Sequence, residues 1–352
     1  MLSEAFEALL CVRGEIQVHL APPISITGPD RVIIAANPRA GAGSPTSIVG
    51  QLADALRSRN LQVEVLTDLA LVATTANRAH QSGTLRALVA AGGDGTVAEL
   101  VNRTDLGVPI SVFPLGTANL LAGYLHIRPH PESFCQMICE GRTIRLDAGR
   151  AGSRIFLLMA GCGFDAEVVQ RLHAARQGGH INMWSYAKPI LAAIRSYKYP
   201  ELRIYCDAAP AEAAPTIVAR WAFVVNLPRY AGGLHFAPQA VGTDGQLNVC
   251  TFQRGSLWHG LKYVGNVWSG RHAALPDYTG SLAQRVHIES DSPVRYQLDG
   301  DPGGMLPLDV EVLPSRLTLL APHHRAVSIA ECLPDSLRRH AATPKTQVLG
   351  RK

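Results

Sequence analysis

The sequence predicts two domains: an α/β domain built on a mostly parallel sheet, followed by a domain of antiparallel strands. The first observation is length, because 352 residues exceed what one hydrophobic core usually organises. The second is that aliphatic runs alternate with helical patterns up to about residue 147, and the third is that short strand-like runs replace this alternation beyond it. Hydrophobic residues make up 47% of the chain, which is enough for two cores.

The first part of the chain repeats one order: an aliphatic run, a turn and a stretch of helical spacing. Residues 31–38 form a run that ends in Asn-Pro, residues 47–60 carry apolar side chains at helical spacing, and residues 61–67 alternate like a strand. Runs at 85–91 and 108–114 each lead through a glycine-containing turn into another helical stretch. Repeated units of this kind predict a mostly parallel sheet with helices on both faces.

Beyond residue 148 the strand-like runs are short and are separated by Gly, Pro and Asp. In order they read RIFLLMAGCGF, LRIYCDA, RWAFVVNL, GQLNVCTFQ, QRVHIES, VRYQLDG and LDVEVLP. One convincing helical pattern interrupts them near 183–198, and AAPAEAAPT at 208–216 indicates a surface hairpin. This composition predicts an antiparallel sandwich or a barrel-like second domain.

The charge balance and the cysteine pattern exclude several classes of function. With 33 Lys and Arg against 28 Asp and Glu, the net charge of +5 suits an anionic substrate or a membrane surface, and no basic stripe with interleaved aromatics supports nucleic-acid binding. The 7 cysteines contain no CxxC pair, which argues against a disulfide framework and a zinc site. No segment reaches the roughly 18 apolar residues of a spanning helix and the N-terminus has no basic start, so we expect a cytoplasmic protein.

Three glycine-containing loops close predicted strands of the first domain. They are NPRAGAG at 37–43, GGDGT at 92–96 and PLGTAN at 114–119. The carboxyl ends of parallel strands meet at one edge of a sheet, and glycine lets the backbone approach phosphate oxygens there. A following helix N-terminus adds partial positive charge, which we expect after Thr96 and Thr117. The loops predict a polyphosphate site that is neither a Walker A loop nor a GxGxxG fingerprint.

Asp94 lies within the second loop and has two interpretations. It can be the N-cap of a helix at Thr96, a common position for Asp. Alternatively it acts with Mg²⁺ or in proton transfer, because an acid beside a phosphate site is repelled unless a metal ion intervenes. We expect the second role, since three glycine loops at strand ends make simple capping the weaker explanation.

Several motifs occur in a fixed order along the chain: NPRAG (37–41), GGDGT (92–96), PLGTANLLA (114–122), DAGR (147–150), GCGFDAEV (161–168), YAGGLHFAPQA (230–240), TDGQLNV (243–249) and LDGD (298–301). Over roughly residues 30–325 this series resembles the diacylglycerol kinase catalytic domain superfamily, which includes bacterial soluble diacylglycerol kinases, related lipid kinases and sphingosine kinases. The resemblance implies an ATP-dependent kinase with a Rossmann-like nucleotide domain and a C-terminal β-sandwich. The active site would lie in the cleft between them.

The domain boundaries follow from the change of pattern together with the resemblance. We expect an N-terminal extension at 1–28, an ATP-binding α/β domain at 29–147, a β-sandwich lipid-binding domain at 148–324 and a tail at 341–352. The resemblance also implies that a final segment, about 325–340, returns to complete the first domain.

The resemblance assigns roles by position. It implies that ATP and its Mg²⁺ are held by Asn37, Gly41, Gly92, Gly93, Asp94, Gly95, Thr96, Gly116, Thr117 and Asn119. It places Asp147 as an acid near the active site. Asp244 matches a position that binds a structural Mg²⁺ in some bacterial members, whereas an Asp-Gly turn between strands is the simpler interpretation from the residues alone.

The resemblance also implies a general base. Where the superfamily usually has Asp-Gly-Glu, this chain has Asp299-Gly300-Asp301, so the last carboxylate is one methylene shorter. Alternation along an extended strand predicts Asp299 and Asp301 on the same side, and a surface turn is the alternative. We assign Asp301 as the catalytic base that takes the proton of the substrate hydroxyl, with Asp94 and Asp147 as further catalytic candidates. A second departure is Leu120, which stands where many members have Asp or Asn.

The resemblance implies a kinase that transfers the γ-phosphoryl group of ATP to the hydroxyl of a diacylglycerol-like or sphingosine-like lipid. An NAD kinase-like small-molecule kinase is an alternative, because NAD kinases share the GGDGT turn. A nucleotide- or lipid-binding regulator with weak turnover is another. The YAGG loop and the LDGD motif fit the lipid kinases better.

The expected partner is a lipid substrate at a membrane surface, reached by transient peripheral contact, and the sequence is compatible with a homodimer. Residues 181–199 combine aromatic and basic side chains: Trp184, Tyr186, Lys188, Arg195, Tyr197, Lys198 and Tyr199. This mixture suits the headgroup boundary of a bilayer. The alternative is a core helix that covers the sheet.

Overall fold

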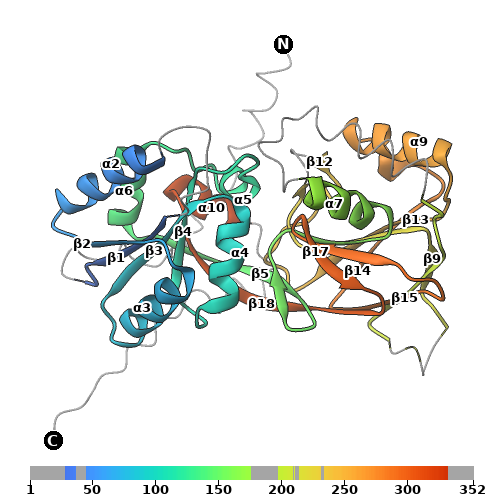
Figure 1. Ribbon diagram of the computed structural model, residues 1–352, viewed down its shortest axis with the longest axis horizontal. Coiled ribbons are helices and arrows are strands. Elements are labelled where there is room, and N and C mark those ends of the chain that lie inside the picture. Colours follow the sequence, from blue (N-terminus) through green and yellow to red (C-terminus); the bar gives the residue numbers. More distant parts are fainter. Residues whose placement is uncertain are drawn as a thin grey trace, which may run out of the picture.

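The computed structural model describes residues 28–36, 45–175, 197–208, 210, 214–230 and 234–331. It consists of two lobes (Figure 1). The N-terminal lobe has helices on both sides of parallel strands, and the C-terminal lobe is built on antiparallel strands. This arrangement confirms the predicted fold class.

The N-terminal lobe is built on parallel strands in the order β2-β1-β3-β4. These strands are β1 (Arg31–Ala36), β2 (Gln62–Leu66), β3 (Leu85–Gly92) and β4 (Pro109–Pro114). Every residue of the inner strand β3 is buried, which explains its nearly unbroken aliphatic sequence. The helices are α2 (Pro45–Arg57), α3 (Leu69–Gln81), α4 (Asp94–Arg103), α5 (Leu120–Tyr124), α6 (Pro131–Glu140) and α10 (His323–Glu331).

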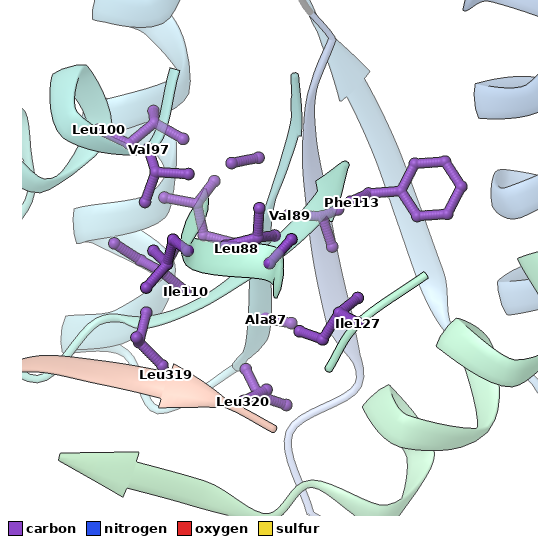
Figure 2. Close-up of a cluster of buried hydrophobic side chains, with 14 of the residues drawn as sticks. Ala87, Leu88, Val89, Val97, Leu100, Ile110, Phe113, Ile127, Leu319 and Leu320 are labelled. Atoms are coloured by element: carbon purple, nitrogen blue, oxygen red, sulfur yellow. The ribbon is translucent and has the colours of Figure 1, made fainter. Parts of the chain in front are cut away.

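The last elements of the described chain contribute to the core of the N-terminal lobe. Figure 2 shows Leu88 of β3 and Ile110 of β4 in one apolar cluster with Leu319. Leu319 belongs to β18 (Leu308–Leu320), and Ile329 of α10 lies in the same core. Residues from distant parts of the sequence therefore close the first domain.

Two long antiparallel strands, β5 (Thr143–Ala151) and β18, join the lobes. β18 pairs with β5 over most of its length, with β4 near its C-terminal end and with β15 (Arg285–Glu289) near its N-terminal end. One ten-stranded sheet therefore runs through both lobes. The boundary that we placed after residue 147 falls in the middle of β5, because the same strand serves both lobes.

The C-terminal lobe contains a six-stranded antiparallel sheet in the order β14-β13-β10-β7-β16-β17. Its strands are β7 (Met159–Cys162), β10 (Trp221–Val225), β13 (Leu247–Phe252), β14 (Tyr278–Ala283), β16 (Arg295–Leu298) and β17 (Asp301–Met305). One face packs against the far end of the ten-stranded sheet through a second apolar core. The smaller elements are β6 (Arg154–Phe156), β8 (Leu202–Cys206), β9 (Ile217–Ala219), β11 (Arg229–Tyr230), β12 (Leu234–His235) and the 3₁₀ helix η3 (His272–Ala274).

The other face of the six-stranded sheet is covered by helices that the sequence analysis missed. They are α7 (Phe164–Ala175) and α9 (Leu257–Trp268), which bury Phe164 and Tyr263 in an aromatic cluster. Each helix follows a glycine-containing turn among short strand-like runs. Because the same glycines were interpreted as turns between strands, the helical patterns were not predicted. The helix predicted near 183–198 lies outside the described residues except for its last two positions.

Arg86 is a buried cation in the middle of the N-terminal lobe. It is only 2% exposed and lies on β3 among aliphatic neighbours. Its guanidinium donates to the carbonyls of Ile138 and Cys139, in the last turn of α6, at 3.2 and 3.1 Å, and to that of Pro29 at 2.9 Å. The last carbonyls of a helix lack intrahelical partners, so Arg86 satisfies them and offsets the helix dipole.

Replacing Arg86 with methionine is expected to lower the free energy of unfolding by about 3 kcal/mol, because buried carbonyls would lose a charged donor. Urea denaturation measures the effect. The matched control is Arg103→Met, since Arg103 forms an i,i+4 ion pair with Glu99 at the surface, where such a pair is worth about 0.5 kcal/mol or less. Equal stability losses in the two variants would contradict the role assigned to Arg86.

Candidate active site

Two of the predicted glycine loops contact one another at the carboxyl ends of β3 and β4. The amide of Leu115 donates to the carbonyl of Gly92 at 3.0 Å. A Cβ on Gly116 would lie 2.5 Å from the Cα of Gly93, which real side chains do not tolerate. Gly116 is therefore required for the close approach of the loops, whereas a Cβ on Gly93 would lie 3.3 Å from the Cα of Gly116. The third loop, with Asn37 and Gly41, lies outside the described residues.

Asp94 connects the two loops and the helices that follow them. Its carboxylate oxygens accept from the backbone N–H groups of Leu120 at 2.9 Å and Leu121 at 3.0 Å. These donors belong to the first turn of α5, while Asp94 itself is the first residue of α4. The alternative interpretation of Asp94 as the N-cap of a helix at Thr96 is wrong, because α4 begins at Asp94 and the carboxylate caps the neighbouring helix α5 instead.

Asn119 holds the third residue of the PLGTAN loop in place. Its backbone has a φ of 48°, a left-handed conformation that asparagine tolerates. Its side chain accepts from the N–H of Gly116 at 2.9 Å and donates to the carbonyl of the same residue at 2.6 Å. Helix α5 begins at Leu120 and not directly after Thr117, because the turn at Asn119 lies between them. The structure thus gives Asn119 a positioning role within the loop.

The remaining loop residues differ in exposure. Gly92 is buried, and a Cβ there would lie 2.3 Å from the hydroxyl of Thr96. Gly95 and Thr117 are exposed, and nothing lies within 4 Å of a Cβ built on Gly95. Gly95 and Thr117 therefore present the open surface of the paired loops, while Gly92 and Thr96 pack beneath it.

A hairpin turn from the C-terminal lobe carries the second group of acids. Asp299 and Gly300 have φ values of 53° and 89°, and Leu298 pairs with Asp301 across the turn. Positive φ at both central residues is the type I′ geometry, for which Asp-Gly is a preferred sequence. The expectation that alternation places Asp299 and Asp301 on the same side of an extended chain is wrong, because the chain reverses between them.

Asp299 is a buried acid near enough to Asp94 for their charges to interact. Its carboxylate accepts the consecutive N–H groups of Leu157, Leu158 and Met159 at 2.6, 2.8 and 3.0 Å. Burial raises the pKa of Asp299 to about 6, the three N–H donors oppose this, and the nearby charge of Asp94 raises it further. This acid was not among the predicted site residues. The turn that we gave as the alternative for Asp-Gly-Asp is confirmed, but only tertiary contacts show which groups surround Asp299.

The pKa of Asp299 predicts a pH effect. Because its folded value of about 6 exceeds the ordinary value of 3.8, the folded state binds more protons between these limits, and the contribution of Asp299 to stability falls as pH rises through about 4 to 6. Asp94→Asn is expected to lower the pKa of Asp299 by removing a neighbouring charge. Carboxyl ¹³C NMR titration measures the shift. With Asp309→Asn as control, an unchanged pKa in Asp94→Asn would show that the two acids do not interact.

Asp301 begins β17 and points toward a different partner. The guanidinium of Arg154 lies 3.2 Å from its carboxylate and also reaches the carbonyl of Pro302 at 3.5 Å. The side chain of Asp301 is 43% exposed, so this acid remains accessible to a substrate. Nearby, buried Gln297 accepts from the N–H of Gly300 at 2.7 Å and donates to Asp165 at 2.8 Å. These contacts fix the turn between Asp299 and Asp301 relative to α7.

Asp147 lies in the joint between the lobes. It is 2% exposed, and its oxygens accept from the N–H groups of Gly245 at 2.8 Å and Ser315 at 2.7 Å. Burial raises its pKa, the two N–H donors lower it, and the charge of Asp244 raises it. The structure therefore gives Asp147 a connecting role between β5, the 242–245 loop and β18, and does not bring it to the exposed surface of the loops.

Asp244 lies beside Asp147 in a turn. One of its oxygens accepts from the N–H of Gln246 at 3.1 Å, as in an Asx turn. The hydroxyl of the adjacent Thr243 is buried and has no hydrogen-bond partner among the described residues. An acid next to an unpaired buried oxygen fits a hard cation such as Mg²⁺. Within the described part of the chain, no three His, Cys, Asp or Glu side chains form a group that could hold a metal ion.

The residues expected at a membrane boundary are placed only in part. Tyr199 is 5% exposed, and its ring stacks on Phe164 and on Trp221. Tyr197 packs edge-on against Phe164 and Tyr199. These two side chains belong to the aromatic core of the C-terminal lobe, so their expected position at a headgroup boundary is wrong. Residues 181–196 lie outside the described residues. In the part of the chain that the structure covers, no helix is both long and apolar enough to cross a bilayer.

Two family models match this chain over its two lobes. Residues 31–151 match the diacylglycerol kinase catalytic domain, and residues 159–321 match the YegS C-terminal NAD kinase beta sandwich-like domain. A crystal structure of a diacylglycerol kinase from Bacillus anthracis superposes with a TM-score of 0.59 at 18% identity, covering 84% of this chain and 98% of that chain. A second structure from the same organism gives a TM-score of 0.65 at 18% identity and the same coverage. At this identity the superpositions show a shared fold.

Curated relatives match about two thirds of the chain. The diacylglycerol kinase of Mycobacterium tuberculosis is 27% identical over 247 residues, which cover 68% of this chain and 77% of that protein. That of Staphylococcus aureus is 26% identical over 245 residues, covering 67% and 74%. An uncharacterized protein of Synechocystis sp. is 28% identical over 248 residues, and the match spans only 54% of its length. The chain is therefore a kinase-family protein that belongs to the diacylglycerol kinase catalytic domain superfamily.

Proposed function

We propose that the protein transfers the γ-phosphoryl group of ATP to the hydroxyl of a lipid, either diacylglycerol-like or sphingosine-like. One observation carries the proposal: α4, which begins at Asp94 between two glycine loops, is hydrogen-bonded through Asn102 to Ile155 at 2.8 Å, next to the segment that holds Asp299 of the Asp-Gly-Asp turn. Asp94 and Asp299 are near enough for their charges to interact. Acids from both lobes thus converge at the carboxyl edge of the sheet, where ligands bind in open α/β folds.

The paired loops would bind the phosphates of the nucleotide. Gly95 and Thr117 are exposed on their surface, and α4 begins beneath them, so a helix N-terminus of partial positive charge lies at the site. Asn119 keeps the PLGTAN loop in shape, and Asp94 holds the start of α5. Mg²⁺ bound with the nucleotide would neutralise phosphate charge next to Asp94. A further Mg²⁺ at Asp244 would stabilise the joint between the lobes.

Asp301 would take the proton of the lipid hydroxyl as that oxygen attacks the phosphorus. Its exposure leaves the carboxylate accessible, and Arg154 orients it. Asp299 is less suited to this step, because three backbone N–H groups already occupy its carboxylate. Asp147 would act as a positioning residue, since it ties the 242–245 loop to β18. Positioning and charge neutralisation supply most of the rate enhancement in phosphoryl transfer.

The lipid acceptor is supported by the relatives, several of which are named diacylglycerol kinase. The test incubates the full chain with radiolabelled ATP, Mg²⁺ and separate acceptors: diacylglycerol and sphingosine in detergent micelles, ceramide in micelles, and NAD. Label on diacylglycerol or sphingosine is expected. Label on NAD alone would make the protein an NAD kinase. Binding of ATP without label on any acceptor would overturn the proposal in favour of a regulator.

A further inference from the structure

Helix α9 has one face that is anchored in the C-terminal lobe. Tyr263 and Val267 are 1% and 4% exposed and pack in the aromatic core with Trp221 and Phe252. The Tyr263 hydroxyl donates to buried Asp277, and Ser256 caps the helix by accepting from its first turn. Figure 1 shows α9 over the same side of the lobe as α7. The helix is therefore held in one orientation by its inner face.

The opposite face of α9 exposes large apolar side chains. Trp258 is 77% exposed and Trp268 is 81% exposed, the highest values among the large hydrophobic residues that the structure describes. Leu261, at 43%, lies between them. Positions 258, 261, 265 and 268 follow the three-and-four spacing of a single helical face. Two tryptophans and a leucine therefore form one continuous outward stripe, and an exposed apolar surface of this kind marks a contact site.

The charged side chains of the segment that carries this stripe, residues 253–276, are all positive. Lys262 lies on the outward face, and Arg254 and Arg271 flank the two ends of the helix; all three are exposed. No Asp or Glu occurs from residue 253 to residue 276. The next acid, Asp277, is 5% exposed and lies against Tyr263. The surface is therefore apolar at its centre and cationic at its margin.

The combination of exposed tryptophans and basic side chains indicates what kind of partner binds this surface. Tryptophan is enriched at bilayer interfaces, where the ring is apolar and the indole N–H stays hydrated, and Lys and Arg reach anionic headgroups from the same depth. A helix of this pattern lies in the plane of the interface with its apolar face among the acyl chains. A protein partner would have to match this cationic margin as well, and none of the described residues covers the two exposed tryptophans.

We propose that the outward face of α9, formed by Trp258, Leu261, Lys262 and Trp268, docks the protein onto a bilayer that contains anionic phospholipid. The inference rests on the proposed lipid substrate for its choice of partner. The sheet that carries α9 also ends in the turn with Asp299 and Asp301, so docking through α9 would bring the catalytic lobe to the lipid. This surface differs from the segment 181–199 that the sequence predicted.

Vesicle binding of the full chain tests the proposal. Sedimentation with phosphatidylcholine vesicles, with or without phosphatidylglycerol, is expected to show binding that depends on the anionic lipid. The double variant Trp258→Ala and Trp268→Ala is expected to lose about tenfold or more in partition coefficient. Lys262→Glu is expected to weaken binding only to the anionic vesicles. The matched control is Leu106→Ala, because Leu106 is a 63% exposed apolar residue in the N-terminal lobe and should not matter.

A second measurement locates the contact without removing it. Brominated lipids are expected to quench tryptophan fluorescence of the wild type, and Trp258→Phe with Trp268→Phe should abolish the quenching while vesicle binding remains. Wild-type binding by the double alanine variant would overturn the proposal. Conversion of a dimer to a monomer by that variant, measured by analytical ultracentrifugation, would instead make the stripe an interface between copies.

The outcome is separable from that of the proposed function. Phosphorylation of micellar lipid by a protein that does not bind vesicles would contradict docking and leave the kinase proposal intact. Vesicle binding without phosphorylation of any lipid would contradict the kinase proposal and leave docking intact. The double alanine variant should retain its activity on micelles, because neither tryptophan lies among the proposed site residues.

Discussion

Asp301→Asn is expected to lower kcat for lipid phosphorylation by about 10²-fold to 10⁴-fold, the usual contribution of a general base. Asparagine cannot take the proton of the attacking hydroxyl, although it matches aspartate in size. The Kd for ATP should stay within about twofold, because Asp301 lies on the C-terminal lobe and not on the phosphate-binding loops. Single-turnover kinetics and nucleotide titration separate these two quantities.

Asp301→Glu is the matched variant. It restores the length that the superfamily usually has at this position and is expected to retain or increase kcat. Arg154→Met should give a smaller loss, because it removes the ion pair that orients the carboxylate but leaves the base in place. If Asp301→Asn phosphorylates lipid as fast as the wild type, the base lies elsewhere, and Asp94 or Asp299 becomes the candidate.

Asp94→Asn is expected to lower kcat/KM for ATP-dependent phosphorylation by about 10²-fold to 10³-fold, as when a single charge-stabilising group is removed from a transition state. The variant loses the negative charge proposed to act with Mg²⁺. In addition, an amide NH₂ would face either Leu120 or Leu121, whose N–H groups now donate to the two carboxylate oxygens. The start of α5 should therefore loosen.

The control for this variant is Asp68→Asn. Asp68 also accepts an N–H from the first turn of a helix, at 2.8 Å from Leu71, but it follows β2, the outermost strand of the sheet. Asp94→Asn should lose about 1 kcal/mol of stability, because one of its two N–H partners would face an NH₂ group. Asp68→Asn should lose less, because the amide oxygen can still accept the single N–H of Leu71, and only Asp94→Asn should lose activity. Full activity of Asp94→Asn with the same loss of stability would restrict Asp94 to capping α5.

The parallel strands and the glycine loops could be predicted because their signals are local. Aliphatic runs such as 85–91 mark buried strands, and the glycines after them mark a turn that a side chain would obstruct. The structure shows why Gly116 must be a glycine: a side chain there would collide with Gly93, 23 positions earlier in the sequence. No local sequence pattern encodes this contact. The motif therefore located the site without revealing its geometry.

The acids show where local reasoning fails. Asp94, Asp147 and Asp299 all accept two or more hydrogen bonds from backbone N–H groups. In the sequence each of them is an Asp near a glycine. Only their hydrogen-bond partners from distant parts of the chain show that Asp94 lies at the loops, Asp147 between the lobes and Asp299 in the hairpin turn. Alternation failed for Asp301, because positive φ values at Asp299 and Gly300 reverse the chain.

The sequence by itself determined the two-domain class, the mostly parallel sheet of the first lobe and the family, because periodicity and ordered motifs depend on residues that are close in the sequence. Tertiary structure alone decided that β5 and β18 carry one sheet through both lobes, that the charges of Asp94 and Asp299 interact, and that Trp258 and Trp268 remain outside the core. The physical reason is that burial, charge coupling and exposure depend on which residues meet in space. Residues as far apart in the sequence as Asp94 and Asp299 come near one another only when both lobes close around the shared strands.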